Sequence, residues 1–285
     1  MQEITQNIII DTSFPGVTLG AINAPHGLIL IDAPLRQEDI RSWRSALLNQ
    51  SGGVDRVLIN MDAHPDRTLG ARSMECTVVG HEDMAYVFRN RPTTFKAANS
   101  ETGAEWEQLP NLGVIRWSPP EISFTHGMQI YWGGTPILLE HRPGSATGAL
   151  WVHIPDEKVI FLGDAVVKDQ PPFISHADLP KWIENLEELL TFQFREYLLI
   201  SGRNGLIAYE DVRRQISFLQ KLLPLADKLA ETKNNNELIE KAIPDLLSGF
   251  TIPVEKTLQY TQRLRFGLTH LHSRESRVPI LDLDE

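Results

Sequence analysis

The chain contains a single cysteine, no long apolar run and no tract of basic residues. One cysteine, Cys76, excludes a framework of disulfides within the chain and is typical of a reducing compartment. No run approaches the roughly 18 apolar residues that cross a bilayer. The first residues also lack the basic and then apolar pattern of an export signal. We therefore expect a cytoplasmic protein that does not enter a membrane.

Basic residues are fewer than acidic ones. The 285 residues include 27 lysines and arginines against 37 aspartates and glutamates, which gives a formal net charge of −10. Without a basic tract the chain cannot neutralise a phosphate backbone, so no nucleic acid is expected as a partner. The apolar fraction of 42% is ordinary for a globular core, and the length suits one large domain or two smaller ones.

Apolar periodicity predicts strands that alternate with helices. Ile40, Trp43 and Leu47 recur at helical spacing and predict a helix over 37–48. Further helices are predicted over 67–75, 81–89, 180–190, 210–232, 237–247 and 254–271, and strand-rich stretches over 8–32, 77–79 and 122–160. The segment 90–113 has mixed polarity, which suggests an insertion or a lid over a pocket.

Four short segments place polar residues and glycine at the ends of apolar runs. They are residues 62–67 (DAHPDR), 143–148 (PGSATG), 161–164 (FLGD) and 201–205 (SGRNG). The first, third and fourth come at the ends of β-branched or aliphatic runs at 57–60, 159–162 and 197–200, which predict buried strands. Three predicted strands are thus each followed by a polar loop.

In order, spacing and setting, these segments resemble the metallo-β-lactamase superfamily. That family's motifs read His-x-His-x-Asp-His, Pro-Gly-His-Thr-x-Gly, Gly-Asp and Gly-His-Gly or similar, and the likeness covers residues 8–220. The resemblance implies an α+β fold, a four-layer αββα sandwich with a C-terminal helical extension. We expect a metallo-β-lactamase-like domain over residues 1–220 and a helical extension over 221–285 packed on it. A subunit contact in a homo-oligomer is the alternative role for these helices.

Compared position by position with the family, most of the metal ligands are exchanged. The residues that stand in place of ligand histidines are Asp62, Arg67, Ser145 and Arg203. The family residue is kept at His64, Asp66 and Asp164, and Asp164 stands where the family's bridging aspartate stands. His141 precedes the second segment where relatives carry a non-ligand histidine, so we expect it to pack or to form hydrogen bonds. The other histidines without a motif are expected to be surface or core polar residues: His26, His81, His126, His153, His270 and His272.

The two arginines oppose a second metal ion. Arginine stays protonated in proteins, so Arg67 and Arg203 cannot ligate a cation and repel one. Two unit charges ~4 Å apart interact by ~4 kcal/mol at an effective dielectric of about 20, and a divalent ion doubles that value for each arginine. We therefore expect no dinuclear zinc centre.

The same arginines can replace the metal as the link between loops. Asp62, Asp66 and Asp164 bring three negative charges, and planar guanidinium groups can bridge carboxylates in bidentate fashion. We interpret Arg67 and Arg203 as structural substitutes for metal. The alternative is that they hold an anionic ligand such as a phosphate or a carboxylate.

One metal ion remains an open alternative at this site. Asp62, His64 and Asp164 are candidate ligands for one Zn, Mn or Fe ion, with Ser145 binding through its hydroxyl or a water. The other interpretation is a dry polar cluster in which His64 is hydrogen-bonded to an aspartate. His176 lies in a loop expected to border the pocket and is a candidate compensating ligand.

Three functions follow from this set of residues. The first is a protein without a cofactor that has lost hydrolysis and binds a small molecule, with an anionic one as a candidate, or a protein partner. The second is a single-metal hydrolase of an ester, thioester or lactone, with Asp66 and His64 as catalytic residues. The third is a metal-free enzyme that uses Asp66, His64 and Arg203 for acid–base chemistry.

Overall fold

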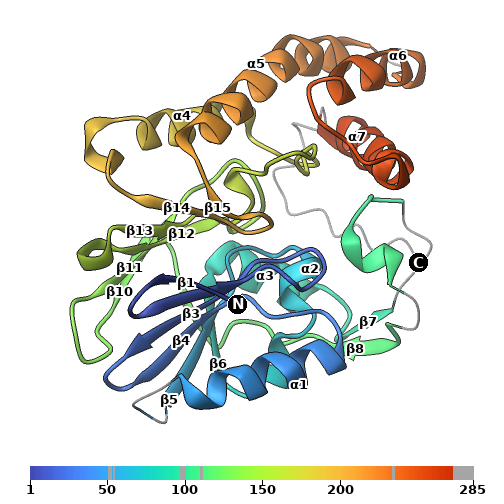
Figure 1. Ribbon diagram of the computed structural model, residues 1–285. Coiled ribbons are helices and arrows are strands. Elements are labelled where there is room, and N and C mark those ends of the chain that lie inside the picture. The colour runs from blue at the N-terminus through green and yellow to red at the C-terminus, as the bar shows by residue number, and fades with distance from the viewer. Residues whose placement is uncertain (51–52, 54, 97–100, 110–111, 233–234, 272–285) are drawn as a thin grey trace.

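Two β-sheets lie at the centre of the computed structural model, which describes residues 1–285 except 51–52, 54, 97–100, 110–111, 233–234 and 272–285 (Figure 1). The seven-stranded sheet has the order β1 (Gln2–Thr5), β2 (Ile8–Asp11), β3 (Leu19–Ala24), β4 (Gly27–Ile31), β5 (Asp55–Ile59), β6 (Thr77–His81) and β9 (Ile122–Phe124). The six-stranded sheet has the order β10 (Gly127–Ile130), β11 (Ile137–His141), β12 (Leu150–Ile154), β13 (Val159–Phe161), β14 (Leu198–Ser201) and β15 (Gly205–Ile207). A hairpin of β7 (Thr94–Lys96) and β8 (Val114–Arg116) is separate from both.

Parallel pairing brings the polar loops to one edge of the molecule. β5 pairs in parallel with β4 and β6, and β13 pairs in parallel with β14. Because parallel strands end at the same edge of a sheet, the loops that follow β13 and β14 begin side by side. The segment 62–67 follows β5 in the same way, and contacts described below join it to those two loops.

Apolar side chains fill the space between the two sheets. Ile10, Ile29 and Ile59 of the first sheet and Val152 and Phe161 of the second belong to one buried cluster. Burial of such side chains contributes ~1.5–3 kcal/mol each relative to exposure, so this layer contributes substantially to stability.

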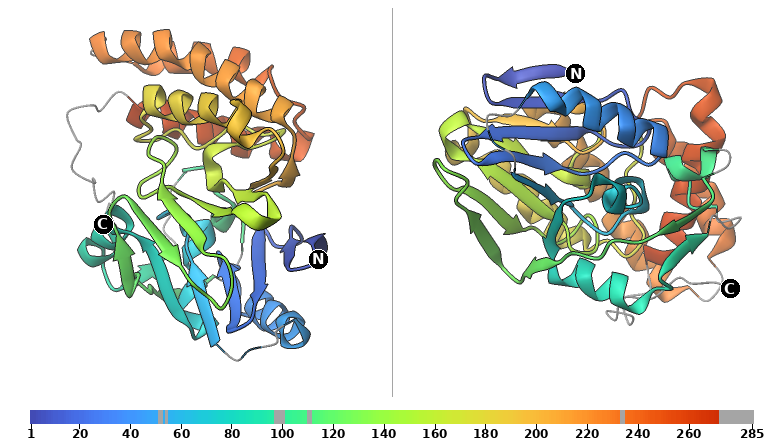
Figure 2. Two further views of the ribbon diagram at one scale, coloured as in Figure 1. Left: turned by 90° about the vertical axis from the view of Figure 1, so that its left-hand side faces the viewer. Right: turned by 90° about the horizontal axis from the view of Figure 1, so that it is seen from below.

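Helices cover the outer faces of both sheets (Figure 2). The helices of the described residues are α1 (Gln37–Ala46), α2 (Pro65–Thr68), α3 (Glu82–Asn90), α4 (Leu179–Leu189), α5 (Tyr209–Glu231), α6 (Asn236–Leu247) and α7 (Thr257–Leu271), of which the four-residue α2 lies in the loop after β5. Trp43 of α1 packs in a cluster with Leu28 and Leu58 of the first sheet. Trp182 of α4 packs in another with Ile160 and Leu199 of the second. The expected αββα layering is confirmed.

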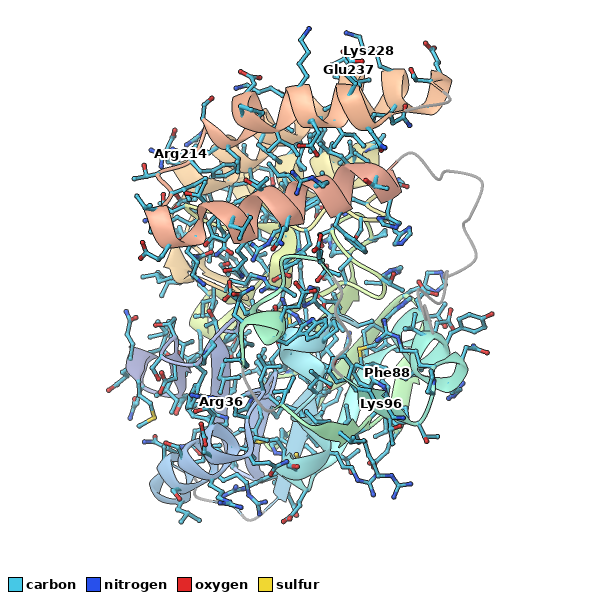
Figure 3. All side chains as sticks on the ribbon, turned by 90° about the vertical axis from the view of Figure 1, so that its right-hand side faces the viewer. Arg36, Phe88, Lys96, Arg214, Lys228 and Glu237 are labelled. Carbon is cyan, nitrogen blue, oxygen red and sulfur yellow. The ribbon has the colours of Figure 1, made fainter. Side chains whose placement is uncertain are left out.

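The C-terminal helices pack on the outer layer of the second sheet. Ile239 of α6 and Leu264 of α7 share the buried cluster that holds α4 and α5. The expected boundary at residue 220 falls inside α5, which runs unbroken from Tyr209 to Glu231. Figure 3 marks α5 and α6 by Lys228 and Glu237, at the opposite end of the molecule from Phe88 on α3. No helix in the described part of the chain is both long and apolar enough to cross a bilayer.

One predicted helix is wrong. In place of a helix over 67–75 the chain forms the four-residue α2 and then a 3-10 turn at Ala71–Met74. Gly70 lies between them, where the backbone approaches Pro34 so closely that a β-carbon would stand 1.8 Å from the Pro34 oxygen. This tertiary contact, which helical periodicity does not register, fixes the chain path at Gly70.

Candidate functional site

The segment after β5 turns into α2, and its polar side chains form hydrogen bonds within this turn. His64 is the N-cap of α2, and its Nδ1 accepts a hydrogen bond from the Asp66 backbone N–H at 3.3 Å. Pro65 begins the helix, a position where its missing N–H costs nothing. Asp62 Oδ1 accepts the His64 N–H at 2.8 Å, which holds the turn together.

Arg67 is completely buried and contacts three aspartates. Its Nη1 donates to Asp32 Oδ2 at 2.7 Å, and its Nη2 donates to Asp164 in a short ion pair. Its Nε lies 2.9 Å from Asp62 Oδ1, although its N–H is not aligned for a hydrogen bond. One guanidinium group therefore joins the loops that follow β4, β5 and β13.

Arg203 adds the loop after β14 to the same cluster. Its Nε lies 2.9 Å from Asp164 Oδ2, and its Nη1 donates to Asp66 Oδ2 at 2.9 Å. Its Nη2 lies 3.2 Å from His64 Nδ1, and the guanidinium carbon stands 4.5 Å from the centre of the Phe173 ring. We call this set of Asp32, Asp62, His64, Asp66, Arg67, Asp164 and Arg203 the ion-pair network.

Burial works against the ionisation of two aspartates in the network. Burial raises the pKa of Asp62 to about 7, because Arg67 offsets only part of the desolvation and Asp164 adds repulsion. Asp62 Oδ2 has no hydrogen-bond partner among the described residues, so it is the oxygen able to carry the proton. Burial raises the pKa of Asp32 as well, although Arg67 opposes the shift.

The other two aspartates are held as carboxylates. Burial alone would raise the pKa of Asp164, but Arg203 and Arg67 outweigh it and keep that pKa well below its usual range. In the same way His64 and Arg203 keep the pKa of Asp66 low. Burial and Arg203 lower the pKa of His64 to about 3, so its imidazole is neutral at pH 7.

The residues of the network do not fit a dinuclear metal centre. Both oxygens of Asp164 face guanidinium groups, whose charge repels a divalent ion. In the described part of the chain, ligand atoms from three side chains lie within 4.8 Å of one another at His81, Asp83 and His141. Asp62, His64 and Asp164 do not meet that condition, and their role as metal ligands stays a prediction.

A lid closes over the network from the segment after β7. Asp66 Oδ1 accepts the Trp106 N–H at 2.9 Å, and Asp66 Oδ2 accepts the Glu105 N–H at 3.3 Å. Both donors belong to a 3-10 turn at Glu105–Gln108. This turn lies in the segment 90–113, for which the sequence suggests either an insertion or a lid.

Helix α7 holds the lid in place. The buried Arg263 donates to the Gly103 oxygen through Nε at 3.0 Å and Nη2 at 2.9 Å. Lys256 Nζ lies 3.0 Å from Glu105 Oε2. Phe173 lies against both Arg203 and Arg263, whose guanidinium carbons stand 4.5 and 4.1 Å from its ring centre. No sequence motif marks Phe173, Glu105 or Arg263, so none of the three was predicted as a site residue.

Two further candidate residues lie on neighbouring loops. Ser145 is buried in the loop after β11, next to Gly144, whose φ of +132° and close approach to the Trp182 backbone exclude a side chain. His176 contacts the ring of His270 on α7, with 5.8 Å between ring centroids. His176 thus lies against helix α7.

A small cavity borders the network beside the lid. Its volume is about 300 Å³, and its lining includes Gly16, Glu105, Arg203, Lys256 and Tyr260. Each of its cations has an acidic partner, because Arg203 is paired with Asp66 and Lys256 with Glu105. The cavity is therefore polar without a large excess of positive charge.

Comparisons with known proteins agree with this fold. No curated protein matches the chain in sequence. A family model described as the metallo-beta-lactamase superfamily matches residues 71–199. The structure is similar to a metallo-beta-lactamase family protein from Thermus thermophilus, with a TM-score of 0.60, 18% identity, and coverage of 96% of this chain and 94% of that one.

Two more solved structures have the same fold. A metallo-beta-lactamase from Pontibacter korlensis gives a TM-score of 0.59 at 17% identity, over 77% of this chain and 97% of that one. A double mutant of the sec-alkyl sulfatase PisA1 gives 0.60 at 14% identity, over 96% of this chain and 49% of that one. The family model thus matches residues 71–199, and the solved structures have the same fold as this chain. Its relatives carry different activities in their names, so the fold alone selects no reaction.

Proposed function

We propose that this chain is a non-hydrolytic member of the superfamily that binds a small molecule or a protein partner, with a network of ion pairs in place of the two-metal centre. The observation that carries the proposal is the position of Arg67 and Arg203. Both guanidinium groups lie in the interior of the network, each against Asp164, which stands at the bridging position of the family motif. A cation at that position would compete with two fixed positive charges.

The closed lid supports the same function. A hydrolase must admit a substrate to the reacting groups and a water molecule beside them. Here Asp66 is 1% exposed, and its carboxylate accepts two backbone N–H groups of the lid and one from Arg203. These bonds lower the basicity of Asp66, which makes it a weak general base.

The cavity beside the lid is the place we assign to the ligand. Its volume of about 300 Å³ is at the small end of ligand sites. Lys256 is 35% exposed and is paired with Glu105, so an anionic group of a ligand could take the place of that carboxylate. We therefore propose a small polar ligand with one acidic group, bound at Lys256 and next to the Tyr260 hydroxyl.

Elemental analysis of protein purified without chelators tests the loss of the metal centre. We expect no metal that depends on Asp62 or Asp164, and no hydrolysis of ester, thioester or lactone substrates above the buffer rate. Two zinc ions per chain would overturn the proposal, as would hydrolysis abolished by Asp164→Asn. Restoring the family ligands in one variant (Asp62→His, Arg67→His, Ser145→His and Arg203→His) should create zinc binding, and a folded variant without it would show that the loops have moved.

A single-metal hydrolase is the second candidate, and one observation favours it. Asp62 Oδ2 has no hydrogen-bond partner among the described residues, and the neutral His64 is in the protonation state of a ligand. In that case Asp62, His64 and Asp164 would hold one Zn, Mn or Fe ion, which supplies Lewis acidity when bound. Asp164 would first have to give up bonds to both arginines. One ion per chain that is lost in Asp62→Asn would establish this candidate.

A further inference from the structure

The ends of strands β6 and β11 bring three metal-binding side chains together outside the ion-pair network. His81 ends β6 and caps α3, Asp83 lies in the first turn of α3, and His141 ends β11. One ligand atom from each lies within 4.8 Å of the others. Because β6 belongs to the first sheet and β11 to the second, this cluster spans the two layers.

His81 already has the tautomer of a ligand. Its Nε2 lies 2.6 Å from the Thr125 backbone oxygen, which can only accept, so Nε2 carries the hydrogen. The lone pair is therefore on Nδ1, which lies 3.4 Å from Asp83 Oδ2 and accepts the Asp83 backbone N–H at 3.2 Å as the N-cap of α3, a hydrogen bond that a bound ion would replace. Histidines that bind metals commonly donate their second N–H to a backbone carbonyl in this way.

The spacing of the ligand atoms is close to that of a tetrahedral site. Bonds of ~2.0–2.1 Å to zinc put ligand atoms roughly 3.3 Å apart. The distance from His81 Nδ1 to Asp83 Oδ2 is already 3.4 Å, and that from His141 Nε2 to the same oxygen is 4.0 Å. The His81 and His141 rings are stacked, with centroids 3.6 Å apart and planes 20° apart. The two ring planes are thus nearly parallel, and His141 must rotate out of the stack to share an ion with His81.

The surroundings allow that rotation and suit a cation. The His141 side chain is 22% exposed and that of Asp83 is 51% exposed, so both have room to move. The first turn of α3 carries the positive end of the helix dipole, and Glu82 and Asp83 offset it.

We propose that His81, Asp83 and His141 bind one late first-row divalent cation of the zinc, nickel or copper class, with water at the open position. Two imidazoles and one carboxylate are donors that such ions favour. The bound ion ties the end of β6 to the end of β11, and through them the first sheet to the second. The site does not depend on the proposed function, because it shares no residue with the ion-pair network.

Metal titration of chelator-treated full-length protein tests the site. We expect Co²⁺ to bind at one ion per chain and to give the intense visible absorption of a four-coordinate site. Zn²⁺ should displace it and raise the midpoint of thermal unfolding as its concentration rises. His141→Gln, which keeps a similar volume and polarity, and Asp83→Asn should each weaken binding by at least about tenfold.

His126→Ala is the matched control, because His126 lies next to His141 and contacts it through its backbone oxygen. It should bind the ion with unchanged affinity. Loss of binding in His126→Ala, retained binding in both His141→Gln and Asp83→Asn, or no saturable binding at one ion per chain would each overturn the site. An ion retained in His141→Gln but lost in Asp62→Asn would instead locate metal in the network, and would contradict the proposed function separately.

Discussion

Replacing Arg203 by alanine removes half of the positive charge that holds the ion-pair network together. The change deletes the contacts of its guanidinium group with Asp164, Asp66 and the Gly16 oxygen. It also removes the group that lies over the Phe173 ring. Asp66 and Asp164 would each lose their ion pair with Arg203. Arg67 would then be the one arginine left in the network, and it already contacts Asp32, Asp62 and Asp164.

The expected loss of stability follows from the burial of these partners. Removing one member of a buried ion pair typically costs 3–5 kcal/mol, because the remaining charge is left without compensation. Asp66 is 1% exposed and Asp164 4% exposed, so both carboxylates depend on Arg203 and Arg67 rather than on water for compensation of their charge. We expect Arg203→Ala to lower the free energy of unfolding by about 4 kcal/mol. Arg203→Lys should recover only part of it, since an ammonium group lacks the bidentate fork.

Urea denaturation followed by far-ultraviolet circular dichroism measures this loss. The matched control is Lys158→Ala, which removes the ion pair with Glu196 on the surface, where the side chains are 54% and 72% exposed. That control should leave the denaturation midpoint unchanged, because exposed pairs contribute little. A change of less than about 0.5 kcal/mol in Arg203→Ala would refute the network, since surface-like positions behave in that way.

Two further predictions concern the proton on Asp62 and the clamp on the lid. The folded-state pKa of Asp62, about 7, lies above its ordinary value of 3.8, so its contribution to stability is present at low pH and is lost as the pH rises through 7. Asp62→Asn should therefore gain about 3 kcal/mol relative to the unmodified chain between about pH 5 and about pH 8, as measured by urea denaturation at several pH values, and a flat difference would contradict the protonated state. Arg263→Ala should cost about 3 kcal/mol and speed hydrogen exchange of the Trp106 amide, which donates to Asp66, and unchanged exchange would show that α7 does not hold the lid.

Much of the fold could be predicted because its elements are locally specified. The strands that end near residues 59, 161 and 201 are short runs of buried β-branched and aliphatic residues, and each appears where the pattern places it. Their order along the chain then restricts the topology to few alternatives. The path at Gly70 could not be predicted, since it depends on contact with Pro34, 36 residues earlier in the chain.

The charges of the arginines and aspartates were the sequence feature that best predicted the contacts in the candidate site. The exchange of histidine for arginine at positions 67 and 203 predicts attraction to the retained aspartates, and the structure brings both side chains against Asp164. The lid could not be predicted in the same detail. Its bonds to Asp66 come from the backbone N–H groups of Glu105 and Trp106, which every residue except proline possesses.

Under the proposed function, the network would explain how the loops stay together without a metal centre. Asp32, Asp62, Asp66 and Asp164 carry four potential negative charges against two from the arginines, so arginine alone leaves two charges uncompensated. The raised pKa values of Asp62 and Asp32 favour protonation of these two carboxyls, which reduces the difference. A proton needs no ligand geometry and remains available at any metal concentration. The loops can therefore stay together when the ligands change one at a time, provided that each lost histidine is replaced by a group that keeps the charge near balance.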